Sequence, residues 1–288
     1  MPDVRSTLEF LARLPLYETE KPYLYLPGKD EGLDPDVVKL DNLEYERHAG
    51  ILIQDLRQHP ELSFDDCGFE FHEFPSRYKQ FETAADTEGY RAETEQLLKK
   101  RFNAERVMVY DIRLRKNDTF NRSEFDIYDP LLVEGPAKGA HNDVTFHSAP
   151  EIVKRYLPQA ECSTFLQPGY RIQILNTWRP LNEVLEDRPL AFCDSRTVDA
   201  DDLMPTDRIL PDRVGEVYYL QHNPNQQWYW IDKQRNEEMA IFLAFDTDRK
   251  EGGARFCPHV SFDNPNAPKG VAKRESVECR AIVITKVS

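Results

Sequence analysis

The chain carries the sequence GAHNDVT at residues 139–145, in which a single residue separates His141 from Asp143. Side chains two positions apart in an extended segment point to the same side, so an imidazole and a carboxylate would face a common point. Two histidines and one carboxylate that leave coordination positions open are typical of non-haem Fe(II) sites that perform oxygen chemistry. The third ligand must come from elsewhere, and His259 in the sequence FCPHVSF (256–262) is the candidate.

The pattern of one histidine two residues before an aspartate is a weak signal by itself, because such a pair on a strand usually lies on a solvent-exposed face. The turn-rich segment 135–140 before His141 would place the pair at the mouth of a strand, where barrels commonly present ligands. His147 and His222 are the alternative imidazoles. On a strand His147 would lie about 20 Å beyond His141, and His222 occupies a QHNP turn typical of solvated residues.

Composition and charge exclude several classes of protein. The 288 residues have 40% hydrophobic and 31% charged side chains, which is typical of a globular protein. A net charge of −14 argues against a nucleic-acid partner, because phosphate binding needs a concentrated basic face. No apolar run approaches the roughly 20 residues that span a bilayer, and the N-terminus lacks a signal pattern. We therefore expect a cytoplasmic protein without a membrane partner, and the sequence leaves its oligomeric state open.

The five cysteines are scattered without a regular spacing, which is typical of reduced thiols inside a cell. They are Cys67, Cys162, Cys193, Cys257 and Cys279. Cys257 lies two residues before His259, but the phenylalanines around it indicate a buried residue rather than a ligand.

The N-terminal part of the chain is predicted to pack on the outside of a β core. We expect an arm over the first forty residues, a hairpin formed by 50–56 and 67–74, and an amphipathic helix over 86–103. His72 falls on the polar side of the second hairpin strand and is expected at the surface.

The rest of the chain is predicted to consist mainly of strands, starting with 106–115 and interrupted by one helix over 150–157. The eight further strands are expected at 141–147, 170–177, 189–194, 215–222, 227–232, 239–246, 255–262 and 275–286. Together they indicate a mainly β fold with flanking helices, a sandwich or a barrel. We expect a single domain over 1–288, in which 1–105 is the arm, hairpin and helix and 106–288 the core.

A second group of functional candidates begins the last strand, in the sequence RESVECR at residues 274–280. Arg274 and Ser276 share one face of that strand, so a guanidinium and a hydroxyl would together suit a small carboxylate. Arg280 lies on the same face, but a strand advances about 3.3 Å per residue and would place it roughly 20 Å from Arg274. We expect only one of the two to reach a metal-bound ligand, and Ser276 favours Arg274.

These residues resemble a known family. An H-x-D pair, a distant histidine and an R-x-S sequence form the pattern of the Fe(II)/2-oxoglutarate-dependent oxygenases, and from about residue 50 onward the chain is similar to their asaB hydroxylase/desaturase group. That group is related to gibberellin desaturase and to a subunit of the cephamycin methoxylation system, and it is frequent in fungal secondary metabolism. The supporting motifs are NTWRPL (176–181), RPLAFCD (188–194), DDL (201–203), QWYW (227–230), PH (258–259) and RESVECR (274–280).

The resemblance implies a double-stranded β-helix, a jelly-roll of the cupin type, as the core. It implies that His141, Asp143 and His259 hold Fe(II) and that Arg274 and Ser276 bind the distal carboxylate of the cosubstrate 2-oxoglutarate, with Arg280 as the alternative. Oxygen would then be used to hydroxylate or desaturate an unactivated C–H position of a small molecule.

Three further residues are candidates for lining the substrate pocket, namely Arg179, Trp178 and Trp228. For Arg179 an ion pair with Asp187 or Asp194 is an equal alternative. Trp228 and Trp230 share one face of a strand, which also fits ordinary core packing.

Three other interpretations remain open from sequence alone. A zinc or manganese hydrolase could use the same three ligands with a metal-bound water as nucleophile, although it would leave Arg274 and Ser276 without a role. A non-catalytic binding protein with a cupin-like barrel would make the histidines incidental. The chain could also be a member of the oxygenase family that has lost its activity.

Overall fold

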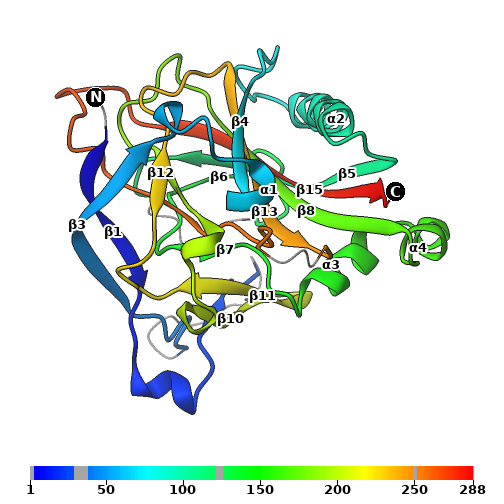
Figure 1. Cartoon of the computed structure of the whole chain (residues 1–288), viewed down its shortest axis with the longest axis horizontal. Helices are drawn as coiled ribbons and strands as arrows, with labels where there is room; N and C mark the ends of the chain where they lie inside the picture. Colours follow the sequence, from blue (N-terminus) through cyan, green and yellow to red (C-terminus); the bar gives the residue numbers. More distant parts are fainter. Residues whose placement is uncertain (1–2, 29–37, 121–125, 249–251, 288) are drawn as a thin grey trace.

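Two β-sheets dominate the computed structural model, which describes residues 3–28, 38–120, 126–248 and 252–287 (Figure 1). The nine-stranded sheet has the order β1 (Val4–Leu11), β3 (Tyr45–Asp55), β12 (Trp228–Trp230), β9 (Leu190–Cys193), β14 (His259–Ser261), β7 (His141–Asn142), β11 (Arg213–Leu220), β10 (Leu203–Leu210) and β2 (Tyr23–Tyr25). The six-stranded sheet has the order β4 (Phe69–Glu73), β13 (Glu238–Asp246), β8 (Tyr170–Pro180), β15 (Glu275–Lys286), β5 (Arg106–Lys116) and β6 (Val133–Glu134).

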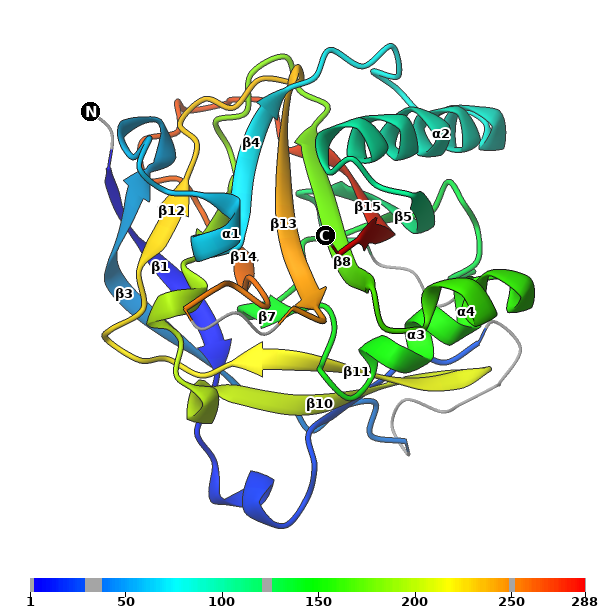
Figure 2. The same ribbon diagram turned by 45° about the vertical axis from the view of Figure 1, so that its right-hand side comes forward.

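The alternation of side chains along β15 separates the outside of the six-stranded sheet from its inside. Val277, Cys279 and Ala281 are fully buried and belong to the apolar cluster that includes Tyr90 and Leu98 of helix α2 (Ala84–Arg101). Figure 2 shows α2 lying along the outer side of this sheet, beside β5 and β15. Residues of the other parity therefore face the space between the two sheets, because successive strand side chains point to opposite faces.

An aromatic cluster fills part of the interior between the sheets. Trp178 and Phe242 come from β8 and β13 of the six-stranded sheet, and Phe192 and Tyr229 come from β9 and β12 of the nine-stranded sheet. The ring centroids of Phe192 and Phe242 lie 5.1 Å apart. These contacts join the two sheets into one jelly-roll, with the metal-ligand candidates beside the cluster.

Short helices complete the fold. They are α1 (Phe64–Cys67), α3 (Ala149–Tyr156), α4 (Gln159–Phe165) and the 3-10 turns η1 (Pro15–Glu18), η2 (Leu56–Gln58), η3 (Ser195–Thr197) and η4 (Ala200–Asp202). Helix α3 follows directly on the segment that carries His141, and its Val153 belongs to the same buried apolar cluster as Ile282 of β15. Among the described residues, no helix is both long enough and apolar enough to cross a membrane.

The mainly β fold with flanking helices is confirmed, but several element predictions are wrong. The segments 50–56 and 67–74 do not form a hairpin, because β3 and β4 belong to different sheets. The N-terminal segment is not only an arm: β1, β2 and β3 are strands of the nine-stranded sheet, while 29–37 lie outside the described residues. The predicted strand 141–147 ends at Asn142, and β10 was not predicted.

Candidate metal centre

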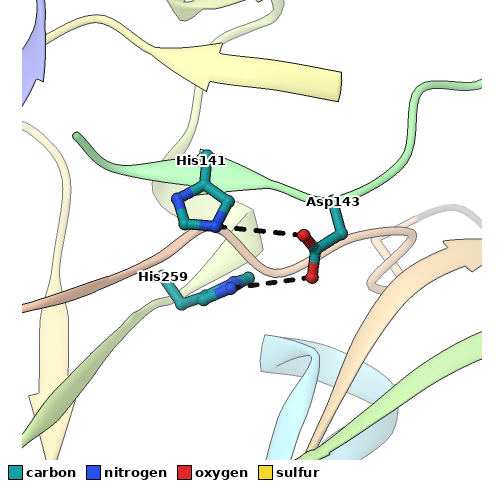
Figure 3. Close-up of side chains that lie close together, drawn as sticks. All are labelled: His141, Asp143 and His259. Carbon is teal, nitrogen blue, oxygen red and sulfur yellow. Dashed lines mark ion pairs between the residues drawn. The ribbon is translucent and has the colours of Figure 1, made fainter. Parts of the chain in front are cut away.

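Three side chains converge between the sheets to form the candidate metal centre (Figure 3). His141 and His259 are cross-strand partners on β7 and β14, and Asp143 lies directly after β7. The distance from His141 Nε2 to Asp143 Oδ1 is 3.9 Å, and the distance from His259 Nε2 to Asp143 Oδ2 is also 3.9 Å. The three donor atoms all lie within 4.8 Å of one another, so residues 116 positions apart in the chain meet at one point.

Both imidazoles are held in the tautomer that a metal requires. His141 Nδ1 donates to the carbonyl oxygen of Gly139 at 2.9 Å, and His259 Nδ1 donates to the carbonyl oxygen of Cys257 at 3.2 Å. In each case the acceptor is the backbone two residues earlier. Because Nδ1 carries the proton, the lone pair of Nε2 is free and points at the shared centre.

The electrostatics of the site favour the ligand forms of all three groups. Burial, and then the neighbouring His259, lower the pKa of His141 to about 4. Burial is also the main cause that lowers the pKa of His259. Burial alone would raise the pKa of the Asp143 carboxyl, but Arg280 and the two histidines outweigh it and hold that pKa well below its usual range. At neutral pH the site therefore offers two neutral imidazoles and one carboxylate, as metal binding demands.

Asp143 is fixed by side chains from the opposite sheet. Arg280 of β15 donates to Asp143 Oδ1 at 2.7 Å, and the Asn176 amide of β8 donates to Oδ2. The same guanidinium bonds Asp111 at 2.9 Å and Glu278 at 2.9 Å. Arg280 thus bridges three carboxylates and lies directly beside the triad.

Arg274, unlike Arg280, pairs with no carboxylate among the described residues. It lines a small cavity together with His141, His259 and Trp178, and only 1% of its surface is exposed. Its Nη1 donates to the carbonyl oxygen of Arg188 at 3.2 Å, whereas its Nε has no hydrogen-bond partner among the described residues. Burial, and then repulsion by Arg115, lower its pKa to about 9.

Ser276 extends this unsatisfied polar surface, because its buried Oγ also lacks a partner within the described part of the chain. Buried polar atoms are nearly always hydrogen-bonded, so two such atoms on one strand face indicate a ligand that supplies acceptors. The cavity that Arg274 lines measures about 20 Å³, the volume of a single water, and its walls must move apart to admit a larger carboxylate and to expose it to Ser276.

The donor set fits a divalent first-row metal. Metal to nitrogen or oxygen bonds of about 2.0–2.2 Å place neighbouring donors roughly 3 Å apart, so the three donor atoms would draw closer together by about 1–2 Å around a bound ion. Two imidazoles and one carboxylate leave the remaining positions free, the arrangement found in non-haem Fe(II) oxygenases.

The other sequence candidates lie in different places. Trp178 lines the small cavity beside the triad. Arg179 points to the opposite face of β8, where it donates to the carbonyl oxygens of Asn236 at 2.9 Å and Tyr78 at 2.6 Å. Its predicted ion pair with Asp187 or Asp194 is therefore wrong. Trp228 packs against Phe10 in a separate apolar cluster, so we leave it and Arg179 out of the site.

The remaining histidines are not part of the triad. The His222 ring stacks on His48 with centroids 3.8 Å apart. His72 is partly exposed and lies 3.0 Å from Glu70. His147 lies in the turn after β7. The separation of about 20 Å from His141 was predicted for a continuous strand, so it does not apply. Cys257 is fully buried, as expected.

Sequence reasoning missed Glu278 and Asn176, two buried polar residues beside the triad. Glu278 lines the small cavity, and burial followed by the charge of Asp143 raises its pKa against the opposing effect of Arg280. Both residues share strand parity with recognised candidates, Glu278 with Arg274 and Asn176 with Trp178. Residues of the same parity on a strand point to the same face, so a search of these strands for polar residues on the face of the candidates would have found both.

Comparisons with known proteins agree with this geometry. A family model described as "YDMC: Oxidoreductase/YMDC permease-like domain" matches residues 8–284. The hydroxylase/desaturase efuI of Hormonema carpetanum is 29% identical over 250 residues, which cover 81% of this chain and 82% of the relative. The alpha-ketoglutarate-dependent dioxygenase tstK of Talaromyces stipitatus is 27% identical over 279 residues, covering 93% and 98% of the two chains.

A solved structure supports the fold. The structure described as the iron and alpha-ketoglutarate-dependent endoperoxidase NvfI superimposes with a TM-score of 0.80 over 99% of both chains, at 23% sequence identity. This similarity extends from the strands of the core to the N-terminal strands β1 and β2, which lie in the first forty residues that were predicted to be an arm.

Proposed function

The chain belongs to the Fe(II)/2-oxoglutarate-dependent oxygenases, in the family of the asaB hydroxylase/desaturase, and we propose that it oxidises an unactivated C–H position of a small molecule in secondary-metabolite biosynthesis. Hydroxylation and desaturation are both within the reach of such a site. Its cofactor is Fe(II), and its cosubstrates are 2-oxoglutarate and O2.

One observation carries the assignment of roles: two Nε2 atoms and a carboxylate face one point, and the cavity beside them is lined by a buried arginine, Arg274, that pairs with no carboxylate among the described residues. We assign His141, Asp143 and His259 as the metal ligands. A hydrolytic site needs only the metal and its water, and gives no reason to bury Arg274 without a carboxylate partner. A 2-oxoglutarate site requires such a cation at a distance from the metal.

The protein's own residues have three tasks in this proposal. Arg274 and Ser276 bind the distal carboxylate of 2-oxoglutarate through a charge-assisted pair and a hydroxyl hydrogen bond. Arg280 and Asn176 keep the Asp143 carboxylate in place, because each engages one of its oxygens.

The third task is the exclusion of water from the reacting atoms. The buried aromatic rings of Trp178 and Phe242 perform it, and the centroid of Phe242 lies 4.6 Å from that of His259. When bound, iron and 2-oxoglutarate would activate O2, which is the oxidant. One oxygen atom would enter succinate as 2-oxoglutarate loses CO2, and the other would take up the two electrons of the substrate C–H bond.

Anaerobic titration tests the proposal directly. Fe(II) followed by 2-oxoglutarate should produce a metal-to-ligand charge-transfer band in the visible spectrum, and exposure to oxygen with ascorbate should then release succinate slowly without added substrate. The His259→Ala variant should produce neither, whereas His222→Ala should behave like the wild type. Binding of both ligands without succinate would contradict an active oxygenase, and binding of metal without 2-oxoglutarate would favour a hydrolase.

A further inference from the structure

A second cavity of about 380 Å³ reaches the triad from the side of Asp143. It lies between strand β5, helix α3 and the hairpin formed by β10 and β11, and it shares no lining residue with the small cavity that holds Arg274. The triad is divided between them, since the two histidines line the small cavity and Asp143 lines the large one. Its volume suits a small organic molecule, so we place the substrate of the proposed oxygenase here.

Charge distinguishes this cavity from the molecule as a whole. The chain has a net charge of −14, yet cationic side chains outnumber acidic ones in the lining. The cations are Lys21, Arg113, Arg155, Arg208, Arg213 and Arg280, and the acids are Asp111, Asp143, Glu151, Asp207 and Glu216. A metal ion bound to Asp143 would also neutralise the charge of this carboxylate and leave the cavity lining more positive.

Arg208 is the unpaired cation of this lining. Each of the other five has a carboxylate oxygen within 4.0 Å, as in the contacts of Arg213 with Asp212 at 2.8 Å and of Arg280 with Asp111 at 2.9 Å. Within the described residues, Arg208 has no carboxylate within that distance and no side-chain hydrogen bond, and its Nε is buried.

The surroundings of Arg208 keep its guanidinium available to the cavity. Its cross-strand partner on β11 is Gly215, which lines the cavity and has no side chain to cover it. Burial, and then the nearby guanidinium groups of Arg280 and Arg113, lower the pKa of Arg208, while Glu134 opposes that shift. A buried cation that is repelled by its neighbours costs free energy in the ligand-free protein, and a bound anion would remove that cost.

We propose that Arg208 binds an anionic group, a carboxylate, of the organic substrate that occupies this cavity. The proposal rests on the proposed function, because the cavity is a substrate site only if the triad is an oxygenase centre. The geometry leaves the reacting part of such a substrate beside Asp143, while its carboxylate is held on β10.

The competing explanation is a structural role in which Arg208 balances Glu134. The Glu134 Oε2 atom lies 3.7 Å from Arg115 and 3.9 Å from Arg113, so it already has two closer guanidinium groups. If Arg208 were structural, its removal would lower the thermal stability. If Arg208 instead serves to bind a ligand, the Arg208→Gln variant should unfold at the same temperature as the wild type or at a higher one, because a desolvated charge is removed.

Binding of a matched pair of probes tests the proposal. Protein loaded anaerobically with Mn(II) and saturating 2-oxoglutarate, so that the Arg274 site is filled, is titrated with 1-naphthoate and with its uncharged counterpart 1-naphthamide. The wild type should bind the carboxylate roughly tenfold or more tightly than the amide. Arg208→Gln should lose this preference, and Arg213→Gln, whose arginine lies in the same cavity but is paired with Asp212, should retain it.

Equal binding of the two probes by the wild type, or no binding of either at millimolar concentration, would overturn the proposal. So would an Arg208→Gln variant that keeps the preference, and a lower melting temperature in that variant would then assign Arg208 to the structural role. The same titration of metal-free protein tests anion binding by Arg208 independently of the oxygenase function. Failure to bind Mn(II) or 2-oxoglutarate refutes the oxygenase, whereas the probe preference still decides whether Arg208 binds an anion.

Discussion

Replacement of Arg274 by Met should stabilise the ligand-free protein and at the same time abolish tight binding of 2-oxoglutarate. The pKa of Arg274 falls from 12.5 to about 9, chiefly because of burial. At 1.36 kcal/mol per pKa unit, this shift corresponds to a cost of about 5 kcal/mol for the buried charge. Met has a similar length and no charge. The variant therefore avoids the free-energy cost of burying a charge but loses the hydrogen bond to the carbonyl oxygen of Arg188.

The same substitution should weaken the binding of 2-oxoglutarate, although it stabilises the ligand-free protein. A buried charge-assisted pair contributes about 2–5 kcal/mol, so its loss should raise the dissociation constant of 2-oxoglutarate by a factor of about thirty or more. Because a ligand stabilises only the form that binds it, saturating 2-oxoglutarate should raise the melting temperature of the wild type far more than that of Arg274→Met. The order of the two melting temperatures should therefore reverse on addition of the ligand.

Thermal unfolding of Mn(II)-loaded protein with and without 2-oxoglutarate, combined with isothermal titration, measures both effects. Arg188→Gln is the control for loss of a neighbouring charge. Arg188 is paired with Asp263 at 2.7 Å, its backbone carbonyl oxygen accepts from Arg274, and its charge helps to lower the pKa of Arg274, so this variant should keep tight binding of 2-oxoglutarate. An Arg274→Met variant that binds 2-oxoglutarate as tightly as the wild type would refute the reasoning. A large loss of stability in the ligand-free variant would likewise show that Arg274 serves the fold.

Three further outcomes are expected. His259→Ala should lose most Mn(II) affinity in anaerobic titration, because two ligands cannot reproduce the charge and geometry of three, and undiminished affinity would reject the triad. Arg280→Met should lower the free energy of unfolding in urea by about 3–5 kcal/mol, because the buried carboxylates of Asp143 and Glu278 and the partly exposed one of Asp111 lose their shared cation, and an unchanged midpoint would contradict this. The metal-free protein should lose up to about 3 kcal/mol as the pH falls from 6.5 to 4, because unfolded chains protonate His141 near pH 6.5 and the folded protein only near pH 4. Urea midpoints that stay constant across that range would refute it.

The parts of the site that follow a period of two were predictable from sequence. The common face of Arg274, Ser276 and Arg280 follows from strand geometry. His141 and Asp143 also lie side by side as expected, although β7 ends at Asn142 and Asp143 lies just beyond the strand. The partner of His141 across the sheet was not derivable in this way. The pairing of His141 with His259 depends on which strands become neighbours, and strand order is a property of the whole sheet.

Errors in the predicted fold have the same cause. The alternation in 67–74 identified a strand correctly but not its partner, because β4 pairs with β13, more than 160 residues away along the chain. Strand β10 was missed because its sequence LMPTDRIL contains Pro205 and charged residues, which lower strand propensity. Tertiary pairing with β11 and β2 overrides that local preference, and the missed strand carries Arg208.

The arginines around the triad differ in one physical respect that explains their roles. Arg280 has three carboxylate partners, so its charge is compensated within the protein and its task is to hold Asp143. Arg274 and Arg208 have none among the described residues, and each lines a different cavity that reaches the triad. The charge of Arg115 lowers the pKa of both, so both guanidinium groups lie within the electrostatic reach of the same cation. A metal ion bound by the triad would raise the affinity of both positions for anions, whereas two bound anions would repel each other, so Mn(II) should tighten anion binding at both positions.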